Sequence, residues 1–544
     1  MLVGIFPFKI FLLIVETYLN FNDCINLFIF FMKKVLFILI LVQYYISSLA
    51  YDFGFTNPVI PGMNPDPSVC RAGDDYYLVT SSFVQYPGLP IYHSNDLIHW
   101  EIIGYCCREE NGFDVSRGSG LYAPTIRYNE KDSTFYVICT NVRNGGNFIT
   151  YTKNPGGAWS RMVYLQHKEM HGIDPSLLFD NDGKCYYTAT HVDGIIQAEI
   201  DPRTGKNLTE PQLIWGGTGG RYPEGPHLYH IGSWYYLIIS EGGTEYGHHV
   251  VASRSNNPWG PFEICPYNPI LSHVEKIAQS NPIQCTGHSD ILQAHDGSWW
   301  AVFLATRPVR GGYHLGRETF LTPVIWTRDY WPVFNGNGVV DLDMCVKTLP
   351  QTEGKSRSKI YDFNTEYIPL EWNYYRHPRK ENFILNDGKL FIKSDDKKTS
   401  FVGVRQCDFE MIAETCLQFS PKYNESEAGL SVRHGTGKHY DIGIRKENNQ
   451  LFLITRFKFS RVNQIEKYPL QKTDKVYLRL VADKEKYTFQ YSFDGINWNG
   501  KDAMDANFLA GGFSGLLVGL YSDNKNSNEE LAGFDYFSYE SLDK

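Results

Sequence analysis

The chain has 544 residues, of which 15% are aromatic, and it contains 48 glycines and 27 prolines. This length exceeds that of one ordinary domain, and many short aromatic segments separated by turn residues favour an all-β protein over a helical one. The net charge of −9 is mild and no basic stripe occurs, which argues against nucleic acid as a partner.

Two apolar segments, residues 1–15 and 28–41, open the chain. The second contains Met32, two lysines, an apolar run and small residues up to Ala50, in the order typical of a secretory signal peptide. The run is too short to span a bilayer comfortably. We therefore predict translation from Met32, with residues 1–31 as upstream sequence, and cleavage after Ala50. The mature protein is expected to be periplasmic or extracellular and to carry no membrane anchor.

The eleven cysteines are irregularly spaced and show no metal-ligand spacing. Cys70, Cys139 and Cys185 lie in or near strand-like segments, where a free thiol behaves as a small hydrophobic group. We expect mostly free thiols and no zinc site, although an exported protein can form disulfides.

The segment NPDPSVCRAGDDYYLVTSS, which begins at Asn64, is repeated along the chain. Each copy has a tight start, a short apolar strand, a polar turn and a strand led by two aromatic residues. Five such units, roughly 50 to 60 residues apart, predict a five-bladed β-propeller; a β-sandwich that reuses hairpins is the alternative. The four later copies begin at Ala123, Asp174, Glu224 and Gly287.

Three acids and a histidine occupy the start of four repeats: Asp66, Asp174, Glu224 and His288. Since the first strand of each blade lines the central channel, these side chains should converge on one polar pocket. Such carboxylates can bind a cation, or they can hydrolyse glycosides, in which one acid protonates the leaving oxygen and a second carboxylate activates water or attacks the sugar. We assign Glu224, with its longer reach, as general acid and Asp66, held between prolines, as general base. Asp174 would orient the acid and set its pKa.

These residues resemble glycoside hydrolase family 43, of the β-xylosidase and α-L-arabinofuranosidase type with a C-terminal β-sandwich. The resemblance implies a five-bladed propeller, an inverting mechanism, the same three catalytic roles and no required cofactor. It covers nearly all of residues 55–335 through the stretches NPDPSVCRAGDDYYLVTSSF, APTIRY, IDPSLLFD, EGPHLYHIGSWYYLIISEGGT, TGHSDILQAHDGSWWAVFLATRP and GRETFLTPVIW.

The resemblance also implies roles for four further residues. Arg307 and Phe83 would contact the sugar in the deepest subsite, and Tyr122 would form an aromatic wall where relatives commonly have Trp. His288 would help to hold a calcium ion or ordered water in the channel. The alternatives are a structural ion pair for Arg307, a core position for Phe83 and a buried hydrogen-bonded histidine for His288.

A second all-β domain follows the propeller domain, which we place at residues 51–348. A polar linker at 349–358 leads to alternating segments such as KLFIKS and SGLLVGLYS, which predict a β-sandwich over 359–544, a jelly roll of the concanavalin or laminin-G type. In the relatives that this chain resembles, the sandwich closes the mouth of the active site. Phe513 in AGGFSG would then approach the first subsites and leave room only for chain ends; a place in the sandwich core is the alternative.

The sequence thus predicts an exported exo-glycosidase that releases xylose or arabinose from the non-reducing ends of xylan-derived oligosaccharides. We expect β-xylosidase activity first and α-L-arabinofuranosidase activity second, although the sequence does not separate the two sugars, which share much of their hydroxyl pattern. The sequence is compatible with an oligomer. The alternatives are a main activity as α-L-arabinofuranosidase, a non-catalytic sugar-binding propeller, and a structural or protein-binding propeller. A pure binder has no need for an acid with a raised pKa.

Overall fold

The computed structural model describes residues 26, 28–35, 53–166, 172–274, 282–346, 348–349, 356–471, 475–501, 503–524, 526 and 529–543. The predicted cleavage site after Ala50, residue Cys24 and residues 350–355 of the predicted linker lie outside these ranges. No helix within them is long and apolar enough to cross a membrane.

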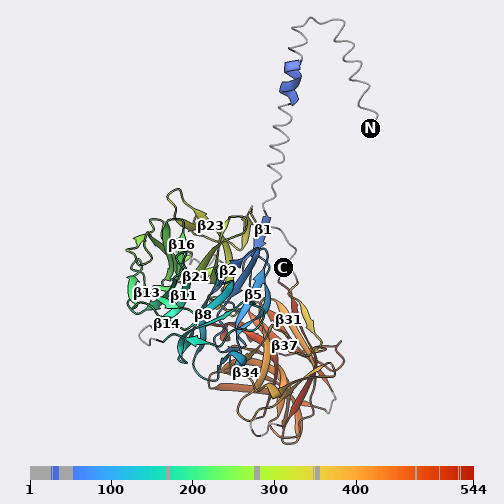
Figure 1. The fold of residues 1–544 in the computed structure, drawn as a ribbon. Helices are drawn as coiled ribbons and strands as arrows, with labels where there is room; N and C mark the ends of the chain where they lie inside the picture. The colour runs from blue at the N-terminus through green and yellow to red at the C-terminus, as the bar shows by residue number, and fades with distance from the viewer. Residues whose placement is uncertain are drawn as a thin grey trace. The chain divides into compact units, whose positions relative to one another are not determined.

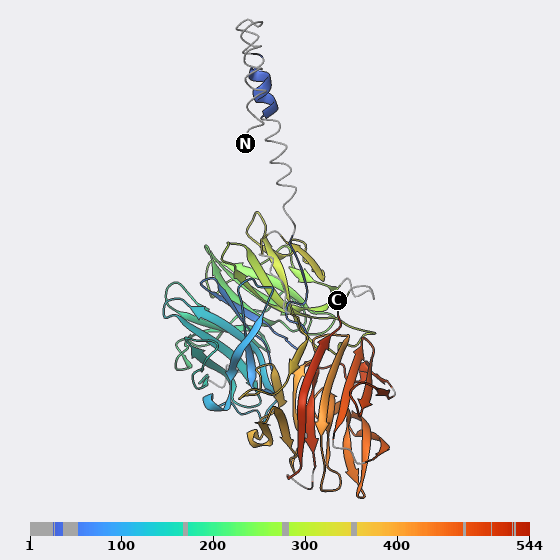
Figure 2. The ribbon, with the colours of Figure 1, turned by 90° about the vertical axis from the view of Figure 1, so that its right-hand side faces the viewer.

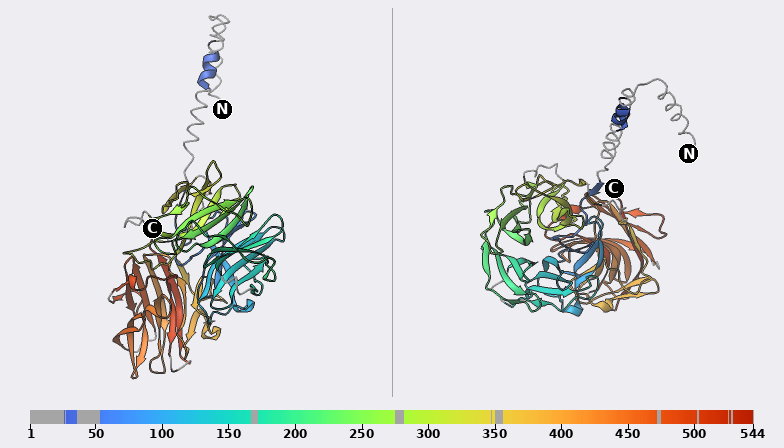
Figure 3. Two further views of the ribbon diagram at one scale, coloured as in Figure 1. Left: turned by 90° about the vertical axis from the view of Figure 1, so that its left-hand side faces the viewer. Right: turned by 45° about the horizontal axis from the view of Figure 1, so that its top comes forward.

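Five antiparallel sheets follow one another along the chain, and each is built from one continuous segment. The right panel of Figure 3 shows them in chain order, blue to yellow, around a common centre. The predicted five-bladed propeller is therefore confirmed. The strands of the first three blades are β2 (Ser68–Ala72), β3 (Asp75–Val79), β5 (Gly88–Ser94) and β6 (Glu101–Cys107); β7 (Gly120–Asn129), β8 (Thr134–Val142), β9 (Gly146–Thr152) and β10 (Val163–Tyr164); and β11 (Ile173–Phe179), β12 (Cys185–His191), β13 (Gly194–Asp201), β14 (Lys206–Asn207) and β15 (Gln212–Trp215). Those of the last two are β16 (Glu224–Ile231), β17 (Trp234–Glu241), β18 (His249–Ser255), β19 (Glu263–Ile264) and β20 (Leu271–Ser272); and β21 (Gln284–Gln293), β22 (Trp299–Thr306), β23 (Glu318–Trp326) and β24 (Pro332–Phe334).

Apolar side chains fill the space between neighbouring blades. Val79 and Ile91 of the first blade share a cluster with Val137 and Phe148 of the second, and similar clusters join the second blade to the third and the third to the fourth. The ten described cysteines are all free and most are buried, as predicted, so they serve as small hydrophobic groups in this packing.

The five innermost strands share a local distortion where each begins. The residue before the repeated proline or serine has a positive φ in every blade, between 45° and 62°. The strand pairing also shifts register at this point in β7, β11, β16 and β21. Such bulges turn a side chain out of the ladder, and they often occur beside active sites. The five residues are Asp66, Ala123, Asp174, Gly225 and His288.

Hydrogen bonds between the first and last parts of the propeller close the ring. The Asn57 side chain is almost fully buried, donates to the Leu321 carbonyl at 3.0 Å and accepts from the Leu321 N–H at 2.8 Å. At the channel, Asp290 of β21 accepts from the Ser68 hydroxyl at 2.6 Å and from the Val69 N–H at 3.0 Å. In the described part of the chain no blade borrows a strand from another, so these bonds take the place of a shared strand.

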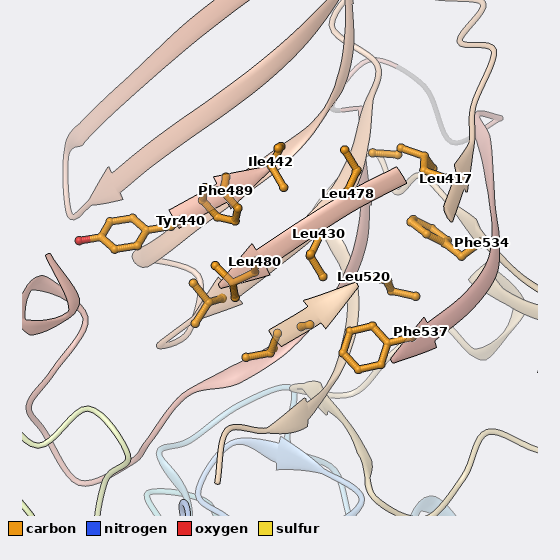
Figure 4. Close-up of a cluster of buried hydrophobic side chains, with 14 of the residues drawn as sticks. Leu417, Leu430, Tyr440, Ile442, Leu478, Leu480, Phe489, Leu520, Phe534 and Phe537 are labelled. Atoms are coloured by element: carbon orange, nitrogen blue, oxygen red, sulfur yellow. The ribbon is translucent and has the colours of Figure 1, made fainter. Parts of the chain in front are cut away.

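The C-terminal region forms a β-sandwich, drawn in orange to red in Figures 1 and 2. Leu430, Ile442, Leu478, Leu520 and Phe534 are fully buried between its two sheets, as Figure 4 shows. One sheet holds β26 (Lys359–Tyr361), β28 (Phe383–Asn386), β29 (Lys389–Lys393), β31 (Met411–Gln418), β36 (Val476–Asp483), β37 (Lys486–Ser492), β38 (Asn499–Gly500), β39 (Met504–Asp505) and β41 (Leu531–Ser541). The other holds β27 (Trp372–Tyr375), β30 (Ser400–Arg405), β32 (Glu427–Arg433), β33 (Lys438–Glu447), β34 (Gln450–Phe459), β35 (Val462–Leu470) and β40 (Leu517–Asp523). Two further short strands, β1 (Phe53–Thr56) and β25 (Asp343–Val346), lie outside blades and sandwich.

The second sandwich sheet continues into the propeller. Its edge strand β27 pairs with β4 (Gln85–Tyr86) from the first blade's β3–β5 connection, with Tyr374 opposite Tyr86 and Tyr375 opposite Gln85. Because backbone hydrogen bonds fix the register of this pairing, the sandwich has one defined position against the blade.

Replacing Asn57 by Ala should destabilise the propeller. The change removes the two side-chain bonds to Leu321 and a longer one to the Asp341 carbonyl (3.4 Å). It leaves the Leu321 N–H and C=O buried without these partners, which should cost about 1 to 3 kcal/mol of unfolding free energy. Urea denaturation followed by tryptophan fluorescence measures it. Asn181→Ala at an exposed turn is the matched control and should change stability by about 0.5 kcal/mol or less. Equal stabilities of the two variants would contradict this account of ring closure.

Candidate active site

Asp66 lies at the start of the first blade, buried and with a left-handed backbone (φ 54°). Its Oδ2 accepts a hydrogen bond from the Ser81 hydroxyl at 2.5 Å, and its Oδ1 accepts one from Nη1 of Arg317 at 2.8 Å. Nδ1 of His288 lies 3.9 Å from the same Oδ1. Non-glycine residues adopt this backbone at a cost of about 1 to 3 kcal/mol, so the surroundings hold Asp66 in place.

The pKa of Asp66 is lowered although the group is buried. Burial by itself raises the pKa, but the charge of Arg317, the nearby His288 and the Ser81 hydrogen bond together outweigh it. Asp66 is therefore a carboxylate at neutral pH and can accept a proton.

The other two acids have pKa values displaced in the opposite direction. Burial and the negative charge of Asp66 raise the pKa of Glu224 to about 7, against the opposing effect of Arg317. Burial and the charges of Glu224 and Asp66 raise the pKa of Asp174 well above its usual value. Because such effects act only over short distances, they place the three predicted acids in one pocket, where the pKa of Asp66 is lowered and those of Glu224 and Asp174 are raised.

Glu224 does not occupy the repeat position that the sequence predicts for it. The residue equivalent to Asp66, Asp174 and His288 in the fourth blade is Gly225, with φ 62°, and Glu224 stands one residue earlier. A Cβ atom on Gly225 would lie 3.0 Å from Nδ1 of His288. The fourth blade therefore needs glycine at the bulge, and the preceding residue supplies the acid.

Arg317 organises this pocket, and sequence reasoning missed it. Its Nη1 also donates to the Thr244 hydroxyl at 3.1 Å, and its Nε and Nη2 donate to the Phe513 carbonyl at 3.3 and 3.2 Å. The only signal in the sequence is the charged pair Arg317-Glu318 at the head of an otherwise apolar strand within GRETFLTPVIW.

Arg307 does not reach the acids, which corrects the role predicted for it. Its guanidinium forms a bidentate ion pair with the buried Glu318, at 2.7 and 2.9 Å, and lies over the ring of Phe409 from the sandwich. The alternative of a structural ion pair is the correct one, and Arg317 is the arginine that contacts Asp66.

Three predicted aromatic residues gather beside Arg317. Phe83 packs edge-on against Tyr122 with ring centroids 4.8 Å apart and lies under the Arg317 guanidinium. The ring centroids of Phe513 and Tyr122 lie 6.4 Å apart, and Phe513 is 51% exposed. A place for Phe513 in the sandwich core is therefore wrong, and its loop contributes both a ring and a carbonyl to the pocket.

His288 is buried, and its backbone N–H donates to the Ser240 hydroxyl at 2.6 Å. Burial lowers the pKa of its imidazole, which is neutral at pH 7. Among the described residues, no group of three or more His, Cys, Asp or Glu side chains is placed to hold a metal. The nearby Asp290 instead accepts hydrogen bonds from Arg127, Ser68 and Tyr229.

His248 is a second residue that the sequence did not indicate. It is buried, its Nδ1 lies 3.2 Å from the Cys285 carbonyl, and its Nε2 has no hydrogen-bond partner within the described part of the chain. Burial lowers its pKa to about 3, so Nε2 is an acceptor if Nδ1 donates to the carbonyl. A Cβ atom on Gly287 would overlap its ring.

Comparison with known proteins places both domains. A model of the glycosyl hydrolases family 43 matches residues 55–332, and a model of the β-xylosidase C-terminal concanavalin A-like domain matches residues 360–540. A protein named non-reducing end α-L-arabinofuranosidase BoGH43B, from Bacteroides ovatus, is 41% identical over 512 residues, which cover 90% of this chain and 95% of the relative. A β-xylosidase from Bacillus subtilis is 31% identical over 536 residues, which cover 89% and 99%. The solved structure described as Bacteroides ovatus Xyloglucan PUL GH43B has a TM-score of 0.84 at 38% identity, covering 90% of this chain and all of that one.

The pocket should release one proton as the pH rises through about 7. A raised pKa means that Glu224 keeps its proton above the usual carboxyl range and loses it near pH 7. Difference titration of the folded protein against Glu224→Gln, by carboxylate infrared absorption between pH 4 and 9, should show this step in the wild type only. Glu210→Gln, at an exposed position, should retain it. A difference confined to the range below pH 5 would contradict the assignment.

Proposed function

The chain belongs to glycosyl hydrolase family 43, and from that premise we propose that it is an exo-acting glycosidase that releases xylose or arabinose from the non-reducing ends of xylan-derived oligosaccharides. One observation carries the proposal. The same pocket lowers the pKa of Asp66 and raises that of Glu224, so a base and an acid coexist at the same pH. Inverting glycoside hydrolysis requires such a pair.

The proposed reaction is a single displacement. The Asp66 carboxylate takes a proton from a water molecule whose oxygen attacks the anomeric carbon, while Glu224 gives its proton to the glycosidic oxygen as the bond between that oxygen and the anomeric carbon breaks. Asp66 leaves the step protonated and Glu224 leaves it charged, and exchange with solvent restores both. Asp174, whose pKa is raised by burial and by its acidic neighbours, orients Glu224.

Contacts of the sandwich support action at chain ends. The Phe513 carbonyl binds Arg317, which itself binds Asp66, and the Phe513 ring stands exposed beside Tyr122. A loop this close to the catalytic base narrows the pocket on one side, which favours a substrate that enters by its terminal sugar.

A main activity as α-L-arabinofuranosidase is the second candidate. The Bacteroides ovatus relative with that name is more similar in sequence than the β-xylosidase from Bacillus subtilis. Tyr122, where relatives that this chain resembles commonly have Trp, gives a smaller aromatic wall. The oligosaccharide substrate and the signal-like segment from Met32 to Ala50 together support an exported enzyme.

Glu224→Gln should nearly abolish hydrolysis of xylobiose or an arabinosyl oligosaccharide, by about 100- to 10,000-fold in kcat, because a glutamine cannot donate the proton. A glycoside with a 2,4-dinitrophenyl leaving group needs little protonation and should lose far less. Asp66→Asn should lower both rates alike, since it removes the base. Circular dichroism and thermal melting check that the variants are folded. Wild-type turnover of xylobiose or the arabinosyl oligosaccharide by a folded Glu224→Gln enzyme would refute the role of Glu224.

The first product released should have the inverted anomeric configuration. Proton NMR of fresh reaction mixtures with 4-nitrophenyl β-D-xylopyranoside should show α-xylose before mutarotation mixes the anomers. The same substrate, compared with 4-nitrophenyl α-L-arabinofuranoside by kcat/KM, decides which sugar is preferred. Initial appearance of β-xylose would exclude the single displacement. Sugar binding without hydrolysis of either substrate would favour a non-catalytic propeller.

A further inference from the structure

Asn64 lies two residues before Asp66 and has hydrogen bonds at every polar atom. It is buried, and its partners come from three separate parts of the molecule: the first blade, the fifth blade and the sandwich. Such a residue fixes the backbone around it, because a buried amide that loses a partner is left unsatisfied. The bonds are Asn64 N–H to the Arg317 carbonyl (2.9 Å), Nδ2 to the Pro61 carbonyl (2.9 Å), the Thr319 hydroxyl to the Asn64 carbonyl (2.6 Å), and the Tyr92 hydroxyl (2.7 Å), Arg405 Nη1 (2.5 Å) and, more weakly, the Thr80 hydroxyl (3.4 Å) to Oδ1.

Asn64, Arg317 and Asp66 are joined in a ring by two hydrogen bonds and by the chain itself. The backbone of Arg317 accepts from Asn64, and the side chain of Arg317 donates to Asp66. Only Pro65 separates Asn64 from Asp66 along the chain. A shift of Asn64 would therefore change the contact between Asp66 and Arg317, which is the contact that keeps Asp66 charged.

Arg405, the last residue of β30 in the sandwich, donates hydrogen bonds to this group of residues. In the described part of the chain its guanidinium pairs with no carboxylate; it donates to Asn64 Oδ1, to the Tyr92 hydroxyl at 3.0 Å and to Gln85 Oε1 at 3.4 Å. Hydrogen bonds from a charged donor are stronger than neutral ones. A partly buried cation is thus directed to the amide that holds the base segment, 341 residues away in sequence.

We propose that Arg405 is a positioning residue for the general base: from the sandwich it holds Asn64, and through Asn64 the segment that aims the carboxylate of Asp66. The sandwich then acts on the reaction itself, in addition to placing Phe513 at the pocket. This inference rests on the proposed function, because it assigns Asp66 the part of the base.

The surroundings of Arg405 allow a chemical test of this role. Arg405 lines a cavity of about 490 Å³ between propeller and sandwich, whose wall also includes Asn64, Trp100, Tyr105 and Lys359. Truncating Arg405 to Ala would open space continuous with that cavity. A guanidinium ion from solution can enter such a space and supply the missing donors to Asn64.

The experiment compares Arg405→Ala with the wild type in steady-state kinetics over pH. We expect kcat to fall about 10- to 100-fold, as small misplacements of catalytic groups do. The acidic limb of the pH profile should move to higher pH, because a loosened Arg317 contact no longer lowers the pKa of Asp66, whereas the alkaline limb set by Glu224 should stay. Millimolar guanidinium should restore a large part of kcat in Arg405→Ala and none in Asp66→Asn.

Lys359→Ala is the matched control, since Lys359 is a cation on the same cavity that pairs with Glu371 and does not contact Asn64. It should leave kcat and both limbs unchanged. A folded Arg405→Ala enzyme with wild-type kcat and acidic limb would overturn the proposal. A loss of kcat without a shift of that limb and without guanidinium rescue would overturn it too, as the mark of a structural role only.

Failure of the proposed function is recognised separately, by a wild-type protein that hydrolyses none of the substrates. The positioning role is then decided without turnover. The Asp66 carboxylate is followed by infrared difference spectra against Asp66→Asn. It should titrate at higher pH in Arg405→Ala than in the wild type, and an unchanged titration would overturn the inference.

Discussion

The contact between the Asp66 carboxylate and the Arg317 guanidinium is the interaction on which the site depends. A carboxylate removed from water loses its hydration, and without a partner it would take up a proton. Arg317 prevents this, and the charge that Asp66 retains then raises the pKa of its two acidic neighbours. Together with burial, this ion pair therefore separates the lowered pKa of Asp66 from the raised pKa values of Glu224 and Asp174.

The ring of blades supplies the geometry that this contact requires. All five inner strands have a residue of positive φ at or near their start, although two of these residues, Ala123 and Gly225, carry no functional side chain. The positive φ is thus a feature of every blade of the propeller, and only some of the blades carry a functional side chain at that position. Ser81 shows how copies cooperate: it donates to Asp66 in its own blade and accepts from the Ala123 N–H of the next.

Local patterns in the sequence predicted the features that the repeat determines, namely the blades and the start of their inner strands. They failed for side chains whose position depends on contacts between distant segments. The repeat frame predicted five blades and the convergence of Asp66, Asp174 and His288, but it misplaced Glu224 by one residue because the fourth blade needs glycine at its bulge. Arg307 and Arg317 flank the same hairpin, and no local pattern tells which one faces the channel. The hydrogen bond from Arg405 to Asn64 depends on the pairing of β27 with β4, and no pattern in the sequence predicts that pairing.

Two adjacent residues, Arg317 and Glu318, explain why the sandwich belongs to the catalytic unit. Glu318 takes Arg307 as its partner and accepts from the Gly62 N–H, which leaves Arg317 free for Asp66. Each arginine is in turn covered by the sandwich, Arg307 by the Phe409 ring and Arg317 by the Phe513 carbonyl. Water in place of these contacts would screen both ion pairs and weaken the effect of charge on the acids. The pKa separation that hydrolysis needs is therefore a property of the two domains together.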